Sequence, residues 1–155
     1  MKLTNEQAIE KRNDINEKFK HMFIPFNKDG PNYSINLFGL QVGNGWLHPI
    51  EIFFNKLEWI RTHNQHLNEN NEMTQIFIHD IKEKFGGIRI YYSAICCERI
   101  TNMIEEAIAY CEALTDCTCE LCGSRQNADG SYVKNESEHG WCSVTCNDCK
   151  HKEFI

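Results

Sequence analysis

Apolar residues recur at helical spacing in three parts of the chain. Residues 4–22 predict an amphipathic helix that opens with the capping-box pair Thr4 and Gln7. A second helix is predicted to begin just before Pro49, because proline suits a first turn, where its missing N–H has no partner to lose. A third is predicted over residues 94–115. Its apolar positions follow steps of three and four and are Cys96, Ile100, Met103, Ile104, Ala107, Ile108, Cys111 and Leu114.

Between the second and third helices the pattern takes the character of strands. Residues 74–81 and 88–92 are rich in Ile, Phe and Tyr, and Gly86 and Gly87 lie between them. This arrangement predicts an antiparallel β-hairpin in which the two glycines supply the positive φ of the turn. The segment 24–47 is expected to be irregular, with Gly43 and Gly45 as turn signals.

The expected fold class is therefore α+β. Three main helices would pack on a small antiparallel hairpin or sheet and form a body over residues 1–115. Apolar density falls sharply after Asp116, so residues 116–155 are expected to form a zinc-ribbon-like element packed on that body. A length of 155 residues suits one domain with such an appendage.

Nine cysteines supply the strongest chemical signal, and none precedes Cys96. The polar N-terminal residues show no secretory signal, which argues against a disulfide framework. Two C-x2-C pairs, Cys119/Cys122 and Cys146/Cys149, offer the four thiolates of a closed tetrahedral zinc site. One structural Zn²⁺ per chain is predicted, with an iron–sulfur cluster as the alternative. Substitute ligands that the pattern leaves open are Cys117, Cys142, His139 and His151.

The predicted hairpin concentrates cations and aromatic residues. Candidate contacts to a partner or to nucleic acid are Lys82, Lys84, Phe85, Arg89 and Tyr92. The alternative is an ordinary amphipathic hairpin with a solvated basic face. The net charge of −6, about −8 with a four-cysteine zinc site, argues against nucleic-acid binding by bulk attraction.

Catalytic signatures are lacking. The sequence has no Walker loop, nucleophile elbow, zinc-protease motif or dinucleotide fingerprint. His63 and His66 could both reach a metal, but a solvated helix end explains them as well. Strand alternation would place His79 and Asp80 on opposite faces and so prevent joint acid–base work. We therefore expect a binding protein rather than an enzyme, located in the cytoplasm and without a membrane partner.

The order of motifs resembles a family of small phage and prophage proteins without an established activity. The resemblance rests on Gly45-Trp46, on the segment Ile81-Lys-Glu-Lys-Phe-Gly-Gly-Ile-Arg-Ile-Tyr91, and on the two C-x2-C pairs with Trp141 before the second. It implies a zinc site, a viral or mobile-element source and, for a viral protein, the host cytoplasm. The expected partner is a host protein or ribonucleoprotein complex, with inhibition of a host defence complex as the expected role. The alternative is a nucleic-acid-binding accessory protein.

Overall fold

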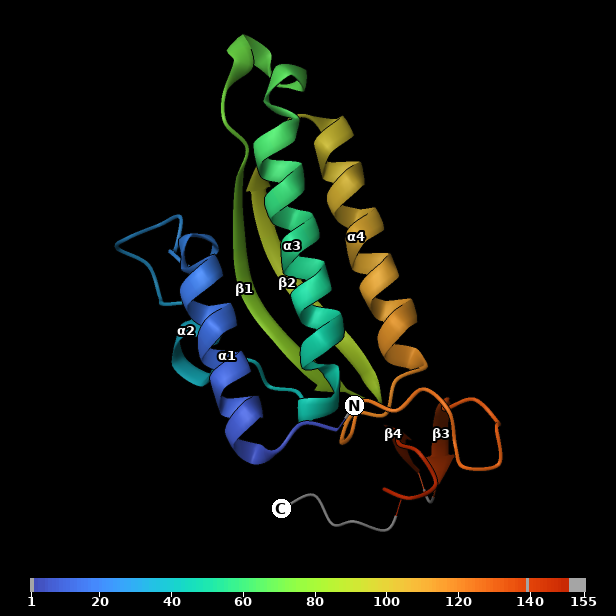
Figure 1. Cartoon of the computed structure of the whole chain (residues 1–155). Helices are drawn as coiled ribbons and strands as arrows, with labels where there is room; N and C mark the ends of the chain where they lie inside the picture. The colour runs from blue at the N-terminus through green and yellow to red at the C-terminus, as the bar shows by residue number, and fades with distance from the viewer. Residues whose placement is uncertain (1, 139, 151–155) are drawn as a thin grey trace.

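A computed structural model describes residues 2–138 and 140–150 (Figure 1). Its helices are α1 (Asn5–Phe19), α2 (Ser34–Phe38), α3 (Leu47–His63) and α4 (Glu98–Asp116), and its strands are β1 (Gln75–Lys84), β2 (Gly87–Ile95), β3 (Asn135–Glu138) and β4 (Trp141–Val144). Short 3₁₀ turns cover Lys20–Met22, Asn44–Trp46, Gln65–Leu67 and Glu69–Asn71. The predicted mixture of helices and antiparallel strands is confirmed.

The ends of the helices show which boundaries the sequence could predict. At α1 the capping box forms: Thr4 Oγ1 accepts from the Gln7 amide at 3.2 Å, and the Gln7 side chain accepts from the Thr4 amide at 2.9 Å. The predicted start of the third helix at residue 94 is wrong. Ala94 and Ile95 still pair with β1, so the strand continues and α4 begins only after the N-cap Cys97. The segment 24–47, expected to be irregular, contains the short helix α2.

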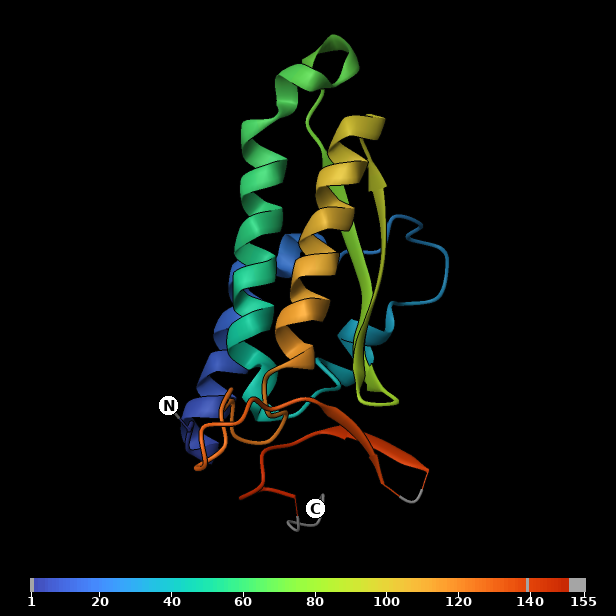
Figure 2. The same cartoon turned by 90° about the vertical axis from the view of Figure 1, so that its right-hand side faces the viewer.

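The β1–β2 hairpin forms the middle layer of the molecule. Helices α3 and α4 lie side by side over one face of it, and α1 packs against α3 (Figures 1 and 2). Helix α2 also contacts β1, and the chain just after it pairs with the edge of β1 through Gln41 and Lys82. The largest fully buried side chains are Trp46, Phe19, Phe54, Ile15, Met22, Leu47, Ile50, Leu57, Ile60, Ile78, Ile81 and Ile88.

A β-bulge interrupts the hairpin at His79. Ile78 pairs with Tyr92 and Asp80 with Tyr91, so His79 is the extra residue. Its ring hydrogen-bonds to Ser93 Oγ at 2.9 Å, whereas Asp80 forms an ion pair with Lys82 at 3.4 Å. The bulge interrupts strict alternation here, and the side chains of His79 and Asp80 have different partners.

The turn of this hairpin also differs from the prediction. Positive φ values occur at Phe85 (54°) and Gly86 (76°), as a two-residue type I′ turn requires, and Gly87 is not among the positive-φ residues. The Gly86 amide donates to Glu83 Oε1 at 2.7 Å, which closes the turn from inside. Phenylalanine occupies a position where glycine or asparagine would adopt the positive φ with less steric strain.

The C-terminal part lies beyond the last turn of α4, next to the turn of the β1–β2 hairpin (Figure 2). Its β3 and β4 form a second antiparallel pair, with Asn135 opposite Val144 and Glu138 opposite Trp141. Asn135 Nδ2 donates to the carbonyl of Phe85 at 3.5 Å, so the two hairpins meet. Among the residues described, no helix has the length and apolar character needed to cross a membrane.

Candidate metal centre

The two C-x2-C pairs come together in space. The sulfurs of Cys119, Cys122, Cys146 and Cys149 all lie within 4.8 Å of one another, and all four cysteines are free thiols. Cys122 Sγ and Cys146 Sγ are 3.6 Å apart, far more than a disulfide bond. An edge of about 3.8 Å is expected for a tetrahedron of sulfurs around a metal at about 2.3 Å. The geometry is consistent with a structural metal.

Each pair is shaped by local backbone hydrogen bonds. In the first, the Gly123 amide donates to the Cys119 carbonyl at 2.8 Å, and the Cys119 amide donates to the Ser124 carbonyl at 2.8 Å. Gly123 has a φ of 79°, a conformation that glycine adopts without steric cost. In the second, the Cys149 amide donates to the Cys146 carbonyl at 3.0 Å. Each pair of cysteines therefore lies in a tight, hydrogen-bonded turn.

The first cysteine turn is docked on the loop that leads into α3. The Gly45 amide donates to the Glu120 carbonyl at 2.7 Å, and the Gly43 amide donates to Glu120 Oε1 at 3.0 Å. A Cβ on Gly45 would lie 2.0 Å from the Cys119 carbonyl oxygen, and one on Gly43 would lie 2.4 Å from the Glu120 carbonyl oxygen. Glycine is therefore required at both positions for the two backbones to approach.

Two further side chains hold this loop in place. The buried Trp46 donates its Nε1–H to the Thr118 carbonyl at 2.8 Å, just before the first cysteine of the cluster. From α1, the Arg12 guanidinium donates to the carbonyls of Leu40 and Val42 at 2.8 and 2.6 Å. The candidate metal centre is thus joined to the body through α1 and the start of α3.

Burial disfavours charged thiolates at two positions of the cluster. Burial raises the pKa of the Cys122 and Cys149 thiols, and the neighbouring Cys119 adds to both effects. Burial also raises the pKa of the Glu120 carboxyl. Thiolates at such a place need a compensating positive charge.

The remaining cysteines lie apart from the cluster. Within residues 2–138 and 140–150, Cys117 and Cys142 do not belong to it. Cys117 accepts from Arg125 at 3.7 Å instead. His139 and His151, the other substitute ligands considered, fall outside the described residues. Cys111 is buried in α4, and burial raises the pKa of its thiol to about 12, as expected for an unreactive core residue.

The candidate contact residues of the β1–β2 hairpin do not share one surface. Tyr92 faces α4, where its hydroxyl donates to Glu105. Lys82 lies over the Tyr91 ring at 5.5 Å and forms an ion pair with the buried Asp80. Lys84, Phe85 and Arg89 are exposed at or next to the turn, and Phe85 is 71% exposed. We call these three residues the hairpin-tip surface.

Two features of the site escaped the sequence analysis. The loop Gly43–Trp46 and Glu120 dock the cysteine turn, yet the sequence pattern marks Gly43 and Gly45 only as turn signals. Two glycines on either side of one residue, just before a tryptophan, are a sequence signal that predicts close backbone approach at this loop. The docking of Glu120 links residues 77 positions apart and has no local signal.

Comparison with known proteins finds no matching protein family, no matching curated protein and no matching solved structure. The resemblance to small phage proteins therefore stays a prediction.

Proposed function

We propose that Cys119, Cys122, Cys146 and Cys149 bind one structural Zn²⁺ and that the chain acts by binding a macromolecular partner. Four sulfurs close the tetrahedral coordination preferred by zinc and leave no position for a reacting water. The distances within the cluster and its four free thiols support this assignment. The metal would hold the C-terminal element against the loop before α3.

The observation that carries the binding proposal is the conformation of Phe85. This bulky residue has a φ of 54°, which costs about 1–2 kcal/mol, and its side chain is 71% exposed. The Lys84 ammonium lies over the Phe85 ring at 5.6 Å, but neither core packing nor the turn itself requires a phenylalanine there. Backbone strain of this kind concentrates at functional positions. We infer that Phe85 is kept for contact with another molecule.

The chemistry around Phe85 favours a protein as that molecule. Lys84 and Arg89 flank it, whereas Lys82 is engaged by Asp80. An aromatic anchor beside an arginine is typical of protein interfaces. The complementary surface would be an apolar pocket with an acidic rim. Two exposed cations, in a chain of net charge −6, are too few to bind the phosphate backbone of a nucleic acid tightly.

The resemblance to small phage proteins adds a biological setting to this proposal. A host protein or ribonucleoprotein complex would be the partner, and occupation of its pocket would inhibit it. The hydrogen bond between Asn135 and Phe85 joins the hairpin-tip surface to the metal-held element, so the metal would help to position that surface for its partner.

The substitution Phe85→Asn tests the proposal. Asn–Gly is a preferred type I′ pair, so the variant should be about 1 kcal/mol more stable than wild type. Immobilised wild-type protein should retain a host protein that Phe85→Asn loses. Phe38→Asn is the matched control, because Phe38 is 67% exposed on α2. Retention of the same proteins by Phe85→Asn would refute a role for this residue.

Nucleic acid is the second candidate, and the same variants distinguish it. If the partner were single-stranded nucleic acid, wild type should bind a labelled oligonucleotide with an affinity that falls steeply as salt rises. Phe85→Asn would then weaken oligonucleotide binding. We expect little oligonucleotide binding in either protein.

A further inference from the structure

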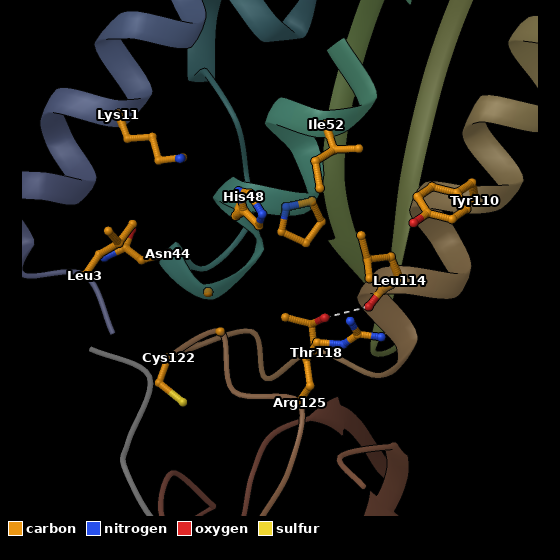
Figure 3. Close-up of a pocket in the computed structure, with 13 residues that line it drawn as sticks. Leu3, Lys11, Asn44, His48, Ile52, Tyr110, Leu114, Thr118, Cys122 and Arg125 are labelled. Atoms are coloured by element: carbon orange, nitrogen blue, oxygen red, sulfur yellow. Dashed lines mark hydrogen bonds between the residues drawn. The ribbon is translucent and has the colours of Figure 1, made fainter. Parts of the chain in front are cut away.

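A cavity of about 370 Å³ lies where the body meets the first cysteine turn. Its walls come from the N-terminal part of the chain, the beginning of α3, the end of α4 and the segment after it (Figure 3). The lining residues include Lys11, His48, Ile52, Leu114, Cys122 and Arg125. No residue of the hairpin-tip surface is among them, so this cavity is separate from the proposed partner surface.

Among the residues that the structure describes, the wall of the cavity contains basic side chains but no acidic side chain. The chain has 22 acidic and 16 basic residues, yet the ionisable nitrogen groups of Lys11, His48 and Arg125 line the cavity without an Asp or Glu beside them in the wall. Lys11 reaches one carboxylate, Glu51, at 3.2 Å. Arg125 contacts a sulfur, Cys117, rather than an acid. The Arg125 guanidinium would attract an anion in the cavity, although the Cys122 sulfur in the same wall partly offsets this attraction.

Much of the remaining wall is apolar, although the polar side chains of Asn44 and Thr118 also line the cavity. Ile52 from α3 lies across the space from Leu114 and the ring of Tyr110 from α4 (Figure 3), and Pro49 also lines the cavity. In the same view the Lys11 ammonium and the Tyr110 hydroxyl point into the space from opposite sides. A volume of this size suits a small organic molecule, and pockets for such ligands combine apolar walls with a few placed polar groups.

We infer that this cavity binds a small amphipathic anion, a carboxylate carried on an aromatic or branched apolar group. The apolar group would lie against Ile52 and Leu114, and the carboxylate would meet the nitrogen groups of Arg125 and His48. The ligand would contact both the body and the cysteine turn, since Gly45 and Gly123 line the same space. Binding would therefore stabilise the contact between them.

The experiment uses 2-naphthoate as the probe and amide chemical shifts of the full chain with zinc added as the readout. We expect saturable shifts confined to the cavity wall, with a Kd below about 1 mM. The uncharged 2-naphthamide, of nearly the same shape, should bind at least tenfold more weakly if the anion is recognised. No saturable shift, shifts away from the wall, or equal affinity for the amide would overturn the assignment.

Two variants locate the site. Arg125→Glu should weaken naphthoate binding at least tenfold, whereas Arg99→Glu, the same charge change on an exposed residue in the first turn of α4, should leave it unchanged. Ile52→Trp, which fills the cavity from the half-buried wall of α3, should abolish binding while the remaining amide spectrum stays folded. Undiminished binding by folded Arg125→Glu or Ile52→Trp protein would overturn the proposal.

Discussion

The amide of Gly45 donates to the carbonyl of Glu120 at 2.7 Å, so the loop before α3 and the first cysteine turn share a backbone hydrogen bond. The contact has no room for a side chain, since a Cβ on Gly45 would lie 2.0 Å from the Cys119 carbonyl oxygen. The candidate metal centre is consequently docked on the body by direct backbone contact, in addition to the side-chain hydrogen bonds of Trp46 and Glu120.

Gly45→Ala should destabilise the protein by about 2–3 kcal/mol, because the methyl group must push two backbones apart. For a chain of this size, that lowers the melting temperature by roughly 4–12 °C. The control is Gly87→Ala, whose added Cβ would meet the flexible end of Arg89 at 2.8 Å. Equal melting temperatures for the two variants would show that the docking contact is loose.

Substitution of the two glycines at the hairpin turn should change the stability of the protein to different extents. Gly86→Val places a β-branched residue at a φ of 76° and against the Asn135 side chain, so it should lower stability strongly. Gly87→Val avoids this φ, and its Cβ meets the movable Arg89 side chain. The melting temperatures of Gly87→Val and Lys84→Ala should therefore be similar, and both should lie well above that of Gly86→Val. The reverse order would contradict the type I′ turn.

Charge reversal at the hairpin-tip surface should weaken partner binding without unfolding the protein. The double variant Lys84→Glu/Arg89→Glu changes exposed residues, so its melting temperature should stay within a few degrees of wild type. Lys82 is left unchanged, because its loss would leave the buried Asp80 carboxylate without its ion pair. Lys28→Glu/Arg99→Glu makes the same change in net charge elsewhere. Equal binding by both double variants would show that the interface lies elsewhere, and the segment around Glu136 would be the next candidate.

Chelation should loosen the C-terminal element before the body. With the metal removed, hydrogen exchange should accelerate at Cys119, Cys149 and the Gly45 amide, because repulsion between desolvated thiolates, or their protonation, opens the cluster. The interior of α4 around Ile104 should keep its protection, since that residue is buried in the main core. Added Zn²⁺ should restore the pattern. Simultaneous loss of protection at Ile104 would mean that body and element fold as one unit.

Sequence pattern predicted what local rules control. Thr4 and Gln7 predicted the start of α1, and the two C-x2-C pairs predicted the cysteine cluster. Both features depend on residues a few positions apart. The failures have nonlocal causes. Strand pairing with Ile76 drew Ala94 into β2, and the bulge at His79 removed the alternation assumed there. Nor could spacing alone predict that Tyr92 would face Glu105 while Phe85 stayed exposed.

X-ray absorption at the zinc K-edge tests the central claim most directly. Protein purified without added metal should contain one zinc per chain, with four sulfur neighbours at about 2.3 Å and no oxygen or nitrogen neighbour. This result would place Cys119, Cys122, Cys146 and Cys149 around one ion. A protein without zinc, or zinc with a mixed sulfur and nitrogen or oxygen shell, would contradict the account.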